Sequence, residues 1–394
     1  MDDTGSTSDV QATSSSPRVA PAVVPDPPAS KEKEASPAAL PDERRLSDLK
    51  DGKETFREGA GTPIDRDRLL TTRIKDLALR IAGTKVERMV EQLYRELGAV
   101  EINFRPICYL SDEWGCPDSR PLIGVPFYLA DEKLGALEGE VSEGRETERE
   151  SVMYLRHEAG HAFCYAYELY KREDFHRLFG PYTRPYVDDY KVQPFSRSYV
   201  RHIAGWYAQK HPDEDFAETF AVYLTPGSNW RAVYAGWPAL RKLEYVEERV
   251  KEFGGLKPSV SVPVPEDLDV PVELIEETVG EAFRREGPPA EVGRELEGHL
   301  DGDLRSLFEG PSEFPLKAAD LIESARAQLI PSISYWTGLA RPTVKAMVLH
   351  LAQRCRTLEL SVKSGNEQTS LARFSVFVTT LAMNRVYAGK FFEI

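Results

Sequence analysis

The chain has 394 residues, 41% of them hydrophobic and 10% aromatic, which is enough for two or three domains with a sizeable core. Its formal net charge of −14 argues against nucleic acid as the main partner and against an anionic membrane surface. No CxxC pair, signal-peptide core or apolar run near the ~18 residues of a membrane span is found, so we expect a soluble, cytoplasmic protein.

The N-terminal part of the chain changes character near residue 60. Residues 1 to about 60 are rich in Ser, Pro, Ala and mixed charge, and we expect a disordered tail, because little there could be buried in a core. Apolar side chains at helical steps then predict a helix over about 70–81 and another over about 86–97. Gly98 suits the C-terminal cap of the second helix.

Two short strands are expected next. Residues 100–110, "VEINFRPICYL", alternate in character, and residues 122–130, "LIGVPFYLA", are a second candidate. Pro126 favours an edge position for the second strand, because proline cannot donate a hydrogen bond to a neighbouring strand.

Helices dominate the rest of the chain. We expect one long helix over 145–169, two shorter ones over about 198–209 and 212–224, and a fourth over 237–255. Pro212 suits the first turn of the third of these.

The predicted fold class is therefore α+β, mainly helical with a small sheet. The expected parts are a disordered tail (1–60), an α+β domain (61–256), a Pro-rich linker (257–272) and a C-terminal all-helical domain (273–394).

The stretch "RHEAGH" carries the strongest chemical pattern. His157 and His161 are four residues apart, so both imidazoles leave the same face of a helix and can reach one zinc ion. Glu158 lies beside them, where it can take a proton from a metal-activated water. The five-residue pattern is only moderately specific, and the alternative is a solvated helix with two unrelated histidines.

A second helix, "HPDEDFAETFAVYL", could complete such a site. Glu214 and Glu218 share one face, and Ala217 and Ala221 would let this helix approach a neighbour closely. One carboxylate can bind zinc while the other accepts the N–H of a ligating histidine, but helical spacing serves either assignment. A solvated acidic face is the alternative.

Two other histidines compete for the place of third ligand. His211 precedes a helix-starting proline and is expected to cap that helix or to lie at the surface. His202, on the preceding predicted helix, is expected to be packed or solvent-facing. Both rank below Glu214.

These segments resemble a known family. "LRHEAGH", "HPDEDFAETFAVYLTP" and "WPALRKLEYVEE" are similar to bacterial zinc-binding metallopeptidases of gluzincin type, over about Leu77 to Phe253. The resemblance implies a zincin-like metallopeptidase domain and Zn²⁺ as cofactor.

A more distant resemblance concerns the pattern Glu-x-x-Ala-Glu in "EDFAE". It is similar to that of the anthrax lethal factor catalytic domain and the Pro-Pro endopeptidases. In those enzymes the first Glu binds zinc, which implies Glu214 as ligand and Glu218 as the residue that orients a histidine. They also place a catalytic Tyr seven residues before the ligand, which corresponds to Tyr207 here.

The function implied is hydrolysis of peptide bonds with Glu158 as general base. Oxyanion charge would be stabilised by the metal and by Tyr207, and a peptide or protein substrate could add as an extended strand along residues 124–130. Two alternatives stay open: a non-catalytic zinc-stabilised binding module, and a site-specific regulatory protease with one target. A protein partner could bind through the C-terminal helical domain.

Overall fold

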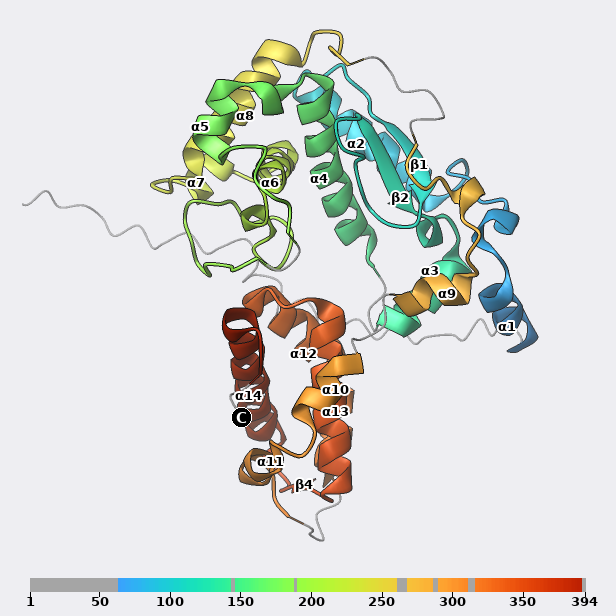
Figure 1. The fold of residues 1–394 in the computed structure, drawn as a ribbon, viewed down its shortest axis with the longest axis vertical. Coiled ribbons are helices and arrows are strands. Elements are labelled where there is room, and N and C mark those ends of the chain that lie inside the picture. Colours follow the sequence, from blue (N-terminus) through green and yellow to red (C-terminus); the bar gives the residue numbers. More distant parts are fainter. Residues whose placement is uncertain are drawn as a thin grey trace, which may run out of the picture. The chain divides into compact units, whose positions relative to one another are not determined.

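The computed structural model describes residues 63–142, 146–187, 190–260, 268–285, 290–310 and 316–391 (Figure 1). The expected tail over residues 1–60 lies outside the described residues and stays a prediction. Within the described residues, no helix combines the length and the apolar character that a membrane span requires.

The protein is mainly helical, with a small parallel sheet, which confirms the predicted α+β class. The helices are α1 (Pro63–Thr71), α2 (Lys85–Ala99), α3 (Glu132–Ser142), α4 (Glu148–Ala166), α5 (Glu173–Phe179), α6 (Pro212–Leu224), α7 (Trp230–Val233), α8 (Leu240–Phe253), α9 (Val279–Arg285), α10 (Ala290–Leu296), α11 (Asp301–Leu307), α12 (Ala318–Thr337), α13 (Arg341–Thr357) and α14 (Glu367–Ala388). Beyond residue 290 the regular elements of the described residues are helices, apart from the two-residue strands β3 (Leu316–Lys317) and β4 (Ser361–Val362).

The sheet near the predicted site differs from the expected one. Strands β1 (Ile107–Ser111) and β2 (Leu122–Pro126) are parallel and shorter than predicted. The far side of β2 is not a free edge at Gly124, because Gly124 exchanges two backbone hydrogen bonds with Gly115, at 2.7 and 3.3 Å. The prediction that a substrate strand could pair along residues 124–130 is therefore wrong at Gly124.

The helix predicted over residues 70–81 is also wrong. Helix α1 ends at Thr71, and only a short 3-10 helix, Ile74–Leu77, follows. The reason is a competing set of backbone partners: the amide of Ile74 donates to the carbonyl of Glu277 and that of Lys75 to the carbonyl of Ile275. Tertiary pairing thus overrides the helical pattern.

The helix predicted over residues 198–209 is absent except for a 3-10 turn, Tyr207–Gln209. Gly205 and Trp206 have φ angles of 86° and 61°, in the left-handed region that no regular helix contains. The backbone amides of His202 and Ile203, just before them, donate to the side chain of Glu218 in α6.

Helices α4 and α6 are the pair that positions the site. A capping box of Thr147 and Glu150 starts α4, and His211 caps α6, whose first residue is Pro212. Gly160 lies where the helices cross: a Cβ atom there would come within 2.7 Å of the Cα of Ala217.

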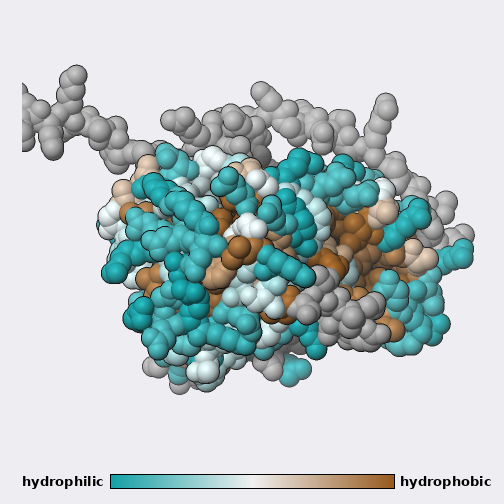
Figure 2. Space-filling model, turned by 90° about the horizontal axis from the view of Figure 1, so that it is seen from above, coloured by the Kyte–Doolittle hydropathy of each residue, from teal (hydrophilic) through white to brown (hydrophobic). Residues whose placement is uncertain are grey.

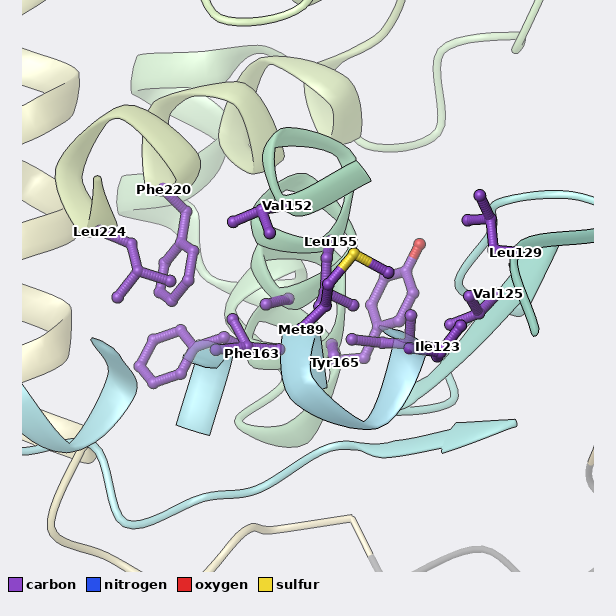
Figure 3. Close-up of a cluster of buried hydrophobic side chains, with 14 of the residues drawn as sticks. Met89, Ile123, Val125, Leu129, Val152, Leu155, Phe163, Tyr165, Phe220 and Leu224 are labelled. Atoms are coloured by element: carbon purple, nitrogen blue, oxygen red, sulfur yellow. The ribbon is translucent and has the colours of Figure 1, made fainter. Parts of the chain in front are cut away.

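A hydrophobic core surrounds this pair. Figure 3 shows Met89 of α2, Phe163 of α4, Phe220 and Leu224 of α6, and Ile123 of β2 in one cluster. The rings of Phe163 and Phe220 stack with centroids 5.1 Å apart. Because both helices are held from the side opposite the histidines, their polar faces are fixed relative to each other.

The described residues contain further buried clusters. One lies within residues 292–391, and a small one surrounds Trp230 and Leu243. Val279 and Phe283 belong to the hydrophobic core that surrounds α4 and α6, although both follow the predicted linker in sequence. The domain boundaries stay predictions. On the face shown in Figure 2, hydrophilic side chains cover most of the surface and hydrophobic ones show only in patches between them.

Candidate metal centre

The predicted site residues converge where α4 and α6 face each other. His157 and His161 project from α4, and Glu214 and Glu218 project from α6; all four side chains are buried. The helices can approach this closely because Gly160, between the two histidines, has no side chain to displace α6.

Three of these side chains direct one ligand atom each at a common point. The Oε2 atom of Glu214 lies 2.9 Å from Nε2 of His157 and 3.2 Å from Nε2 of His161. The two Nε2 atoms are 3.1 Å apart. All three atoms lie within 4.8 Å of one another, and two imidazoles with one carboxylate are a ligand set that zinc favours. The residues therefore fit a zinc ion.

Glu218 lies behind the first histidine. Its Oε1 atom is 3.0 Å from Nδ1 of His157, on the opposite side of the ring from Nε2. The carboxylate also accepts the backbone N–H groups of His202 and Ile203, with closest distances of 3.2 and 3.0 Å. These amides hold Glu218 in place, and Glu218 in turn holds the imidazole ring.

The second histidine has a carboxylate neighbour that sequence reasoning missed. Oδ2 of Asp213 lies 3.1 Å from Nδ1 of His161, without the alignment of a hydrogen bond. Tyr165 donates a hydrogen bond from its hydroxyl to the same oxygen, and the hydroxyl oxygen of Tyr182 lies 3.3 Å from that of Tyr165. Only the position of Asp213 next to Glu214 could have indicated this role.

The two alternative histidine ligands are engaged elsewhere. Nδ1 of His211 accepts the N–H of Asp213 at 3.2 Å as the cap of α6, and its Nε2 lies 2.8 Å from the carbonyl of Arg184. Nε2 of His202 lies 2.9 Å from the carbonyl of Met153. In this structure both nitrogens of His211 are taken, and His202 points at the backbone.

A pocket of about 470 Å³ opens onto the three converging atoms. Both predicted catalytic residues, Glu158 and Tyr207, line it, and the ring centroids of His157 and Tyr207 are 5.5 Å apart. The segment from Trp114 to Cys116, which pairs with β2, forms another wall. Tyr186, which the sequence did not single out, also lines the pocket.

The electrostatics of the cluster favour a cation. Burial lowers the pKa of His157, but hydrogen bonds to Glu214 and Glu218 outweigh it and raise that pKa to about 9. Burial also lowers the pKa of His161, yet the negative charges of Asp213 and Glu214 raise it well above its ordinary value. Three carboxylates thus stabilise positive charge at the imidazoles, and a divalent cation supplies such charge.

Burial has the opposite effect on the general-base candidate. It raises the pKa of Glu158, and the positive charge of the neighbouring histidines only partly offsets this. Burial and the charge of Glu214 likewise raise the pKa of Tyr207, so that its hydroxyl keeps its proton at neutral pH.

Searches of curated proteins and of solved structures found no match to the chain. A family model does match, and its span includes α4 and α6, the helices that carry His157, His161 and Glu214. Residues 138–232 of this chain match the family described as putative zinc-binding metallo-peptidase.

Proposed function

We propose that this protein is a zinc-dependent hydrolase of peptide bonds. His157, His161 and Glu214 hold the metal, and Glu158 is the general base. The observation that carries the proposal is the convergence of three ligand atoms within 4.8 Å at a pocket that Glu158 also lines. The family match supports a peptidase role in general. When bound, zinc supplies Lewis acidity, which lowers the pKa of a water molecule and polarises the scissile carbonyl.

Glu158 moves the proton in this proposal. Its carboxylate accepts a proton from the attacking water and passes it to the nitrogen of the leaving amine. The carboxylate is placed for this role because it lines the same pocket as the three converging ligand atoms.

Tyr207 stabilises the charge that develops on the carbonyl oxygen. Its raised pKa keeps it a hydrogen-bond donor, and its ring lies beside that of His157. A donor fixed in place before the reaction stabilises an oxyanion more strongly than mobile water does.

The substrate is a peptide that lies along the wall from Trp114 to Cys116. This segment, rather than β2, faces the pocket, and its Gly115 is paired to β2 on the other side. An extended peptide adds to such a segment through backbone hydrogen bonds.

The proposal is tested by metal analysis together with a peptide library. The wild-type protein should contain about one zinc per chain and cleave peptides, whereas Glu158→Gln should keep the zinc and lose cleavage. Zinc without cleavage in the wild type would indicate a zinc-stabilised binding module. Cleavage of one protein but of no library peptide would indicate a site-specific protease.

A further inference from the structure

Tyr186 makes direct contact with the carboxylate of the third ligand. Its hydroxyl donates a hydrogen bond to Oε1 of Glu214. The residue lies outside helices and strands, and 52% of its surface is exposed. An exposed tyrosine is not needed for the core, so this contact calls for a role at the site.

The two oxygens of Glu214 have different partners. Oε2 lies 2.9 and 3.2 Å from the Nε2 atoms of His157 and His161, and Oε1 is bonded to Tyr186. The hydrogen bond thus divides the carboxylate into one oxygen that faces the histidines and one that faces a phenol. A hydrogen bond to a charged carboxylate is stronger than one between neutral groups. It therefore holds Oε1 of Glu214 toward Tyr186 and leaves Oε2 toward the histidines.

The ring of Tyr186 is itself held in place. The ammonium group of the buried Lys210 lies 4.3 Å from its centroid, and the ring of His211 packs with its centroid 5.3 Å away. A cation over an aromatic face is attracted by the negative face of the ring. The hydroxyl also lies 3.5 Å from that of Tyr207.

We propose that Tyr186 is a positioning residue that keeps Glu214 bound to the metal through Oε2 alone. The inference rests on the proposed zinc site. A carboxylate without this hydrogen bond is free to turn both oxygens toward the metal. It would then occupy the position that a catalytic zinc site leaves open for water or substrate. Tyr186 thus preserves the open position without touching the metal.

The test is the visible spectrum of the cobalt(II)-substituted protein, because four-coordinate cobalt absorbs several-fold more strongly than five-coordinate cobalt. In Tyr186→Phe, which keeps the ring and removes the hydroxyl, the absorption should fall several-fold while cobalt content stays near one per chain. Turnover of the zinc form should fall by about 10–100-fold, the usual range for loss of a partner of a metal ligand.

Tyr190→Phe is the matched control. It removes one tyrosine hydroxyl from the same part of the chain, where that hydroxyl donates to the carbonyl of Gly205 at 3.1 Å. Its cobalt spectrum should equal that of the wild type, which would show that loss of a nearby hydroxyl alone does not alter the coordination.

The outcomes separate this inference from the proposed function. An unchanged cobalt spectrum in Tyr186→Phe overturns the inference, and lost turnover beside that spectrum would show that Tyr186 acts on substrate. A changed spectrum in a protein whose wild type cleaves no peptide supports the inference and removes the peptidase proposal. A wild type that binds neither cobalt nor zinc overturns both.

Discussion

Nδ1 of His157 lies 3.0 Å from Oε1 of Glu218, while Nε2 of the same ring lies 2.9 Å from Oε2 of Glu214. One imidazole therefore separates two glutamates that stand four residues apart on the same helix. Glu214, the glutamate at Nε2, also lies beside Nε2 of His161. Glu218, the glutamate at Nδ1, is not one of the three residues whose ligand atoms converge. This asymmetry favours Glu214 as the ligand and Glu218 as the residue that orients the ring.

The two glutamates should respond differently to substitution. Glu214→Ala removes a proposed ligand, so zinc should be lost or bound far more weakly. Glu218→Ala leaves three ligands but frees the ring of His157, which should cost about 10–100-fold in zinc affinity or activity. Competition with a chelator measures both affinities. Zinc retained in Glu214→Ala but lost in Glu218→Ala would reverse the two roles.

Metal binding and catalysis should separate within α4. His157→Ala removes a proposed ligand and should abolish tight zinc binding and activity together. Glu158→Gln keeps nearly the same shape but cannot accept a proton, so zinc content should stay near one per chain while turnover falls by about 100-fold or more. Atomic absorption and peptide cleavage report the two properties. Full zinc content in the double variant His157→Ala/His161→Ala would refute the assignment of the metal site.

Much of this site could be predicted from local spacing. The four-residue steps of His157 and His161, and of Glu214 and Glu218, lie within single helices, where spacing fixes the face. The predicted bounds of α6, 212–224, are those observed, because Pro212 starts the helix. The predicted cofactor, zinc, is confirmed by the match to a family described as zinc-binding and by the buried cluster of His157, His161 and Glu214.

What could not be predicted depends on contacts across the chain. Tyr165 and Asp213 are 48 residues apart in sequence, and Tyr186 and Glu214 are 28 apart. No spacing rule connects such pairs. The failed helix over residues 198–209 has the same origin, because its amides bond to Glu218 instead of to carbonyls one turn earlier. Tertiary partners there outweigh local propensity.

Gly160 should be intolerant of a side chain. In Gly160→Ala the new Cβ would lie 2.7 Å from the Cα of Ala217 and 2.9 Å from its carbonyl oxygen, so α4 and α6 must move apart. We expect a loss of about 1–3 kcal/mol in the free energy of unfolding, and weaker zinc binding. Urea unfolding measures the first effect.

Gly302→Ala is the control for that substitution. Gly302 lies in α11, and nothing lies within 4 Å of the position that a Cβ atom would take there. Alanine there should be neutral or stabilise the protein by up to about 1 kcal/mol, because it lowers the entropy of the unfolded chain. Equal losses at both positions would show that the close approach at Gly160 is not the cause.

Because of Asp174, the free energy of unfolding should depend on pH in the acidic range. Hydrogen bonds from Arg172 lower its pKa from 3.8 to about 2, and Arg249 lies 2.9 Å from the same carboxylate. The folded pKa is below the unfolded one, so this stabilisation is complete above about pH 5 and is lost as the pH falls toward 2. It amounts to about 1–2 kcal/mol after allowance for solvent screening.

The comparison is Asp174→Asn against the wild type, by urea unfolding between about pH 5 and pH 2.5. The gap in stability between the two proteins should narrow as the pH falls through this window. Glu173→Gln, at a carboxylate whose side chain is 95% exposed, should leave the profile unchanged. A gap that stays constant with pH would exclude the ion pair as its source.

The two amides bonded to Glu218 also link the metal site to local opening of the chain. His202 and Ile203 lie in a stretch without helices or strands, where few backbone hydrogen bonds resist opening. When this stretch opens, Glu218 loses both amide donors and its hold on His157 loosens. We therefore expect bound zinc to slow hydrogen exchange at these two amides, because Glu218 orients His157 only while both amide donors are in place.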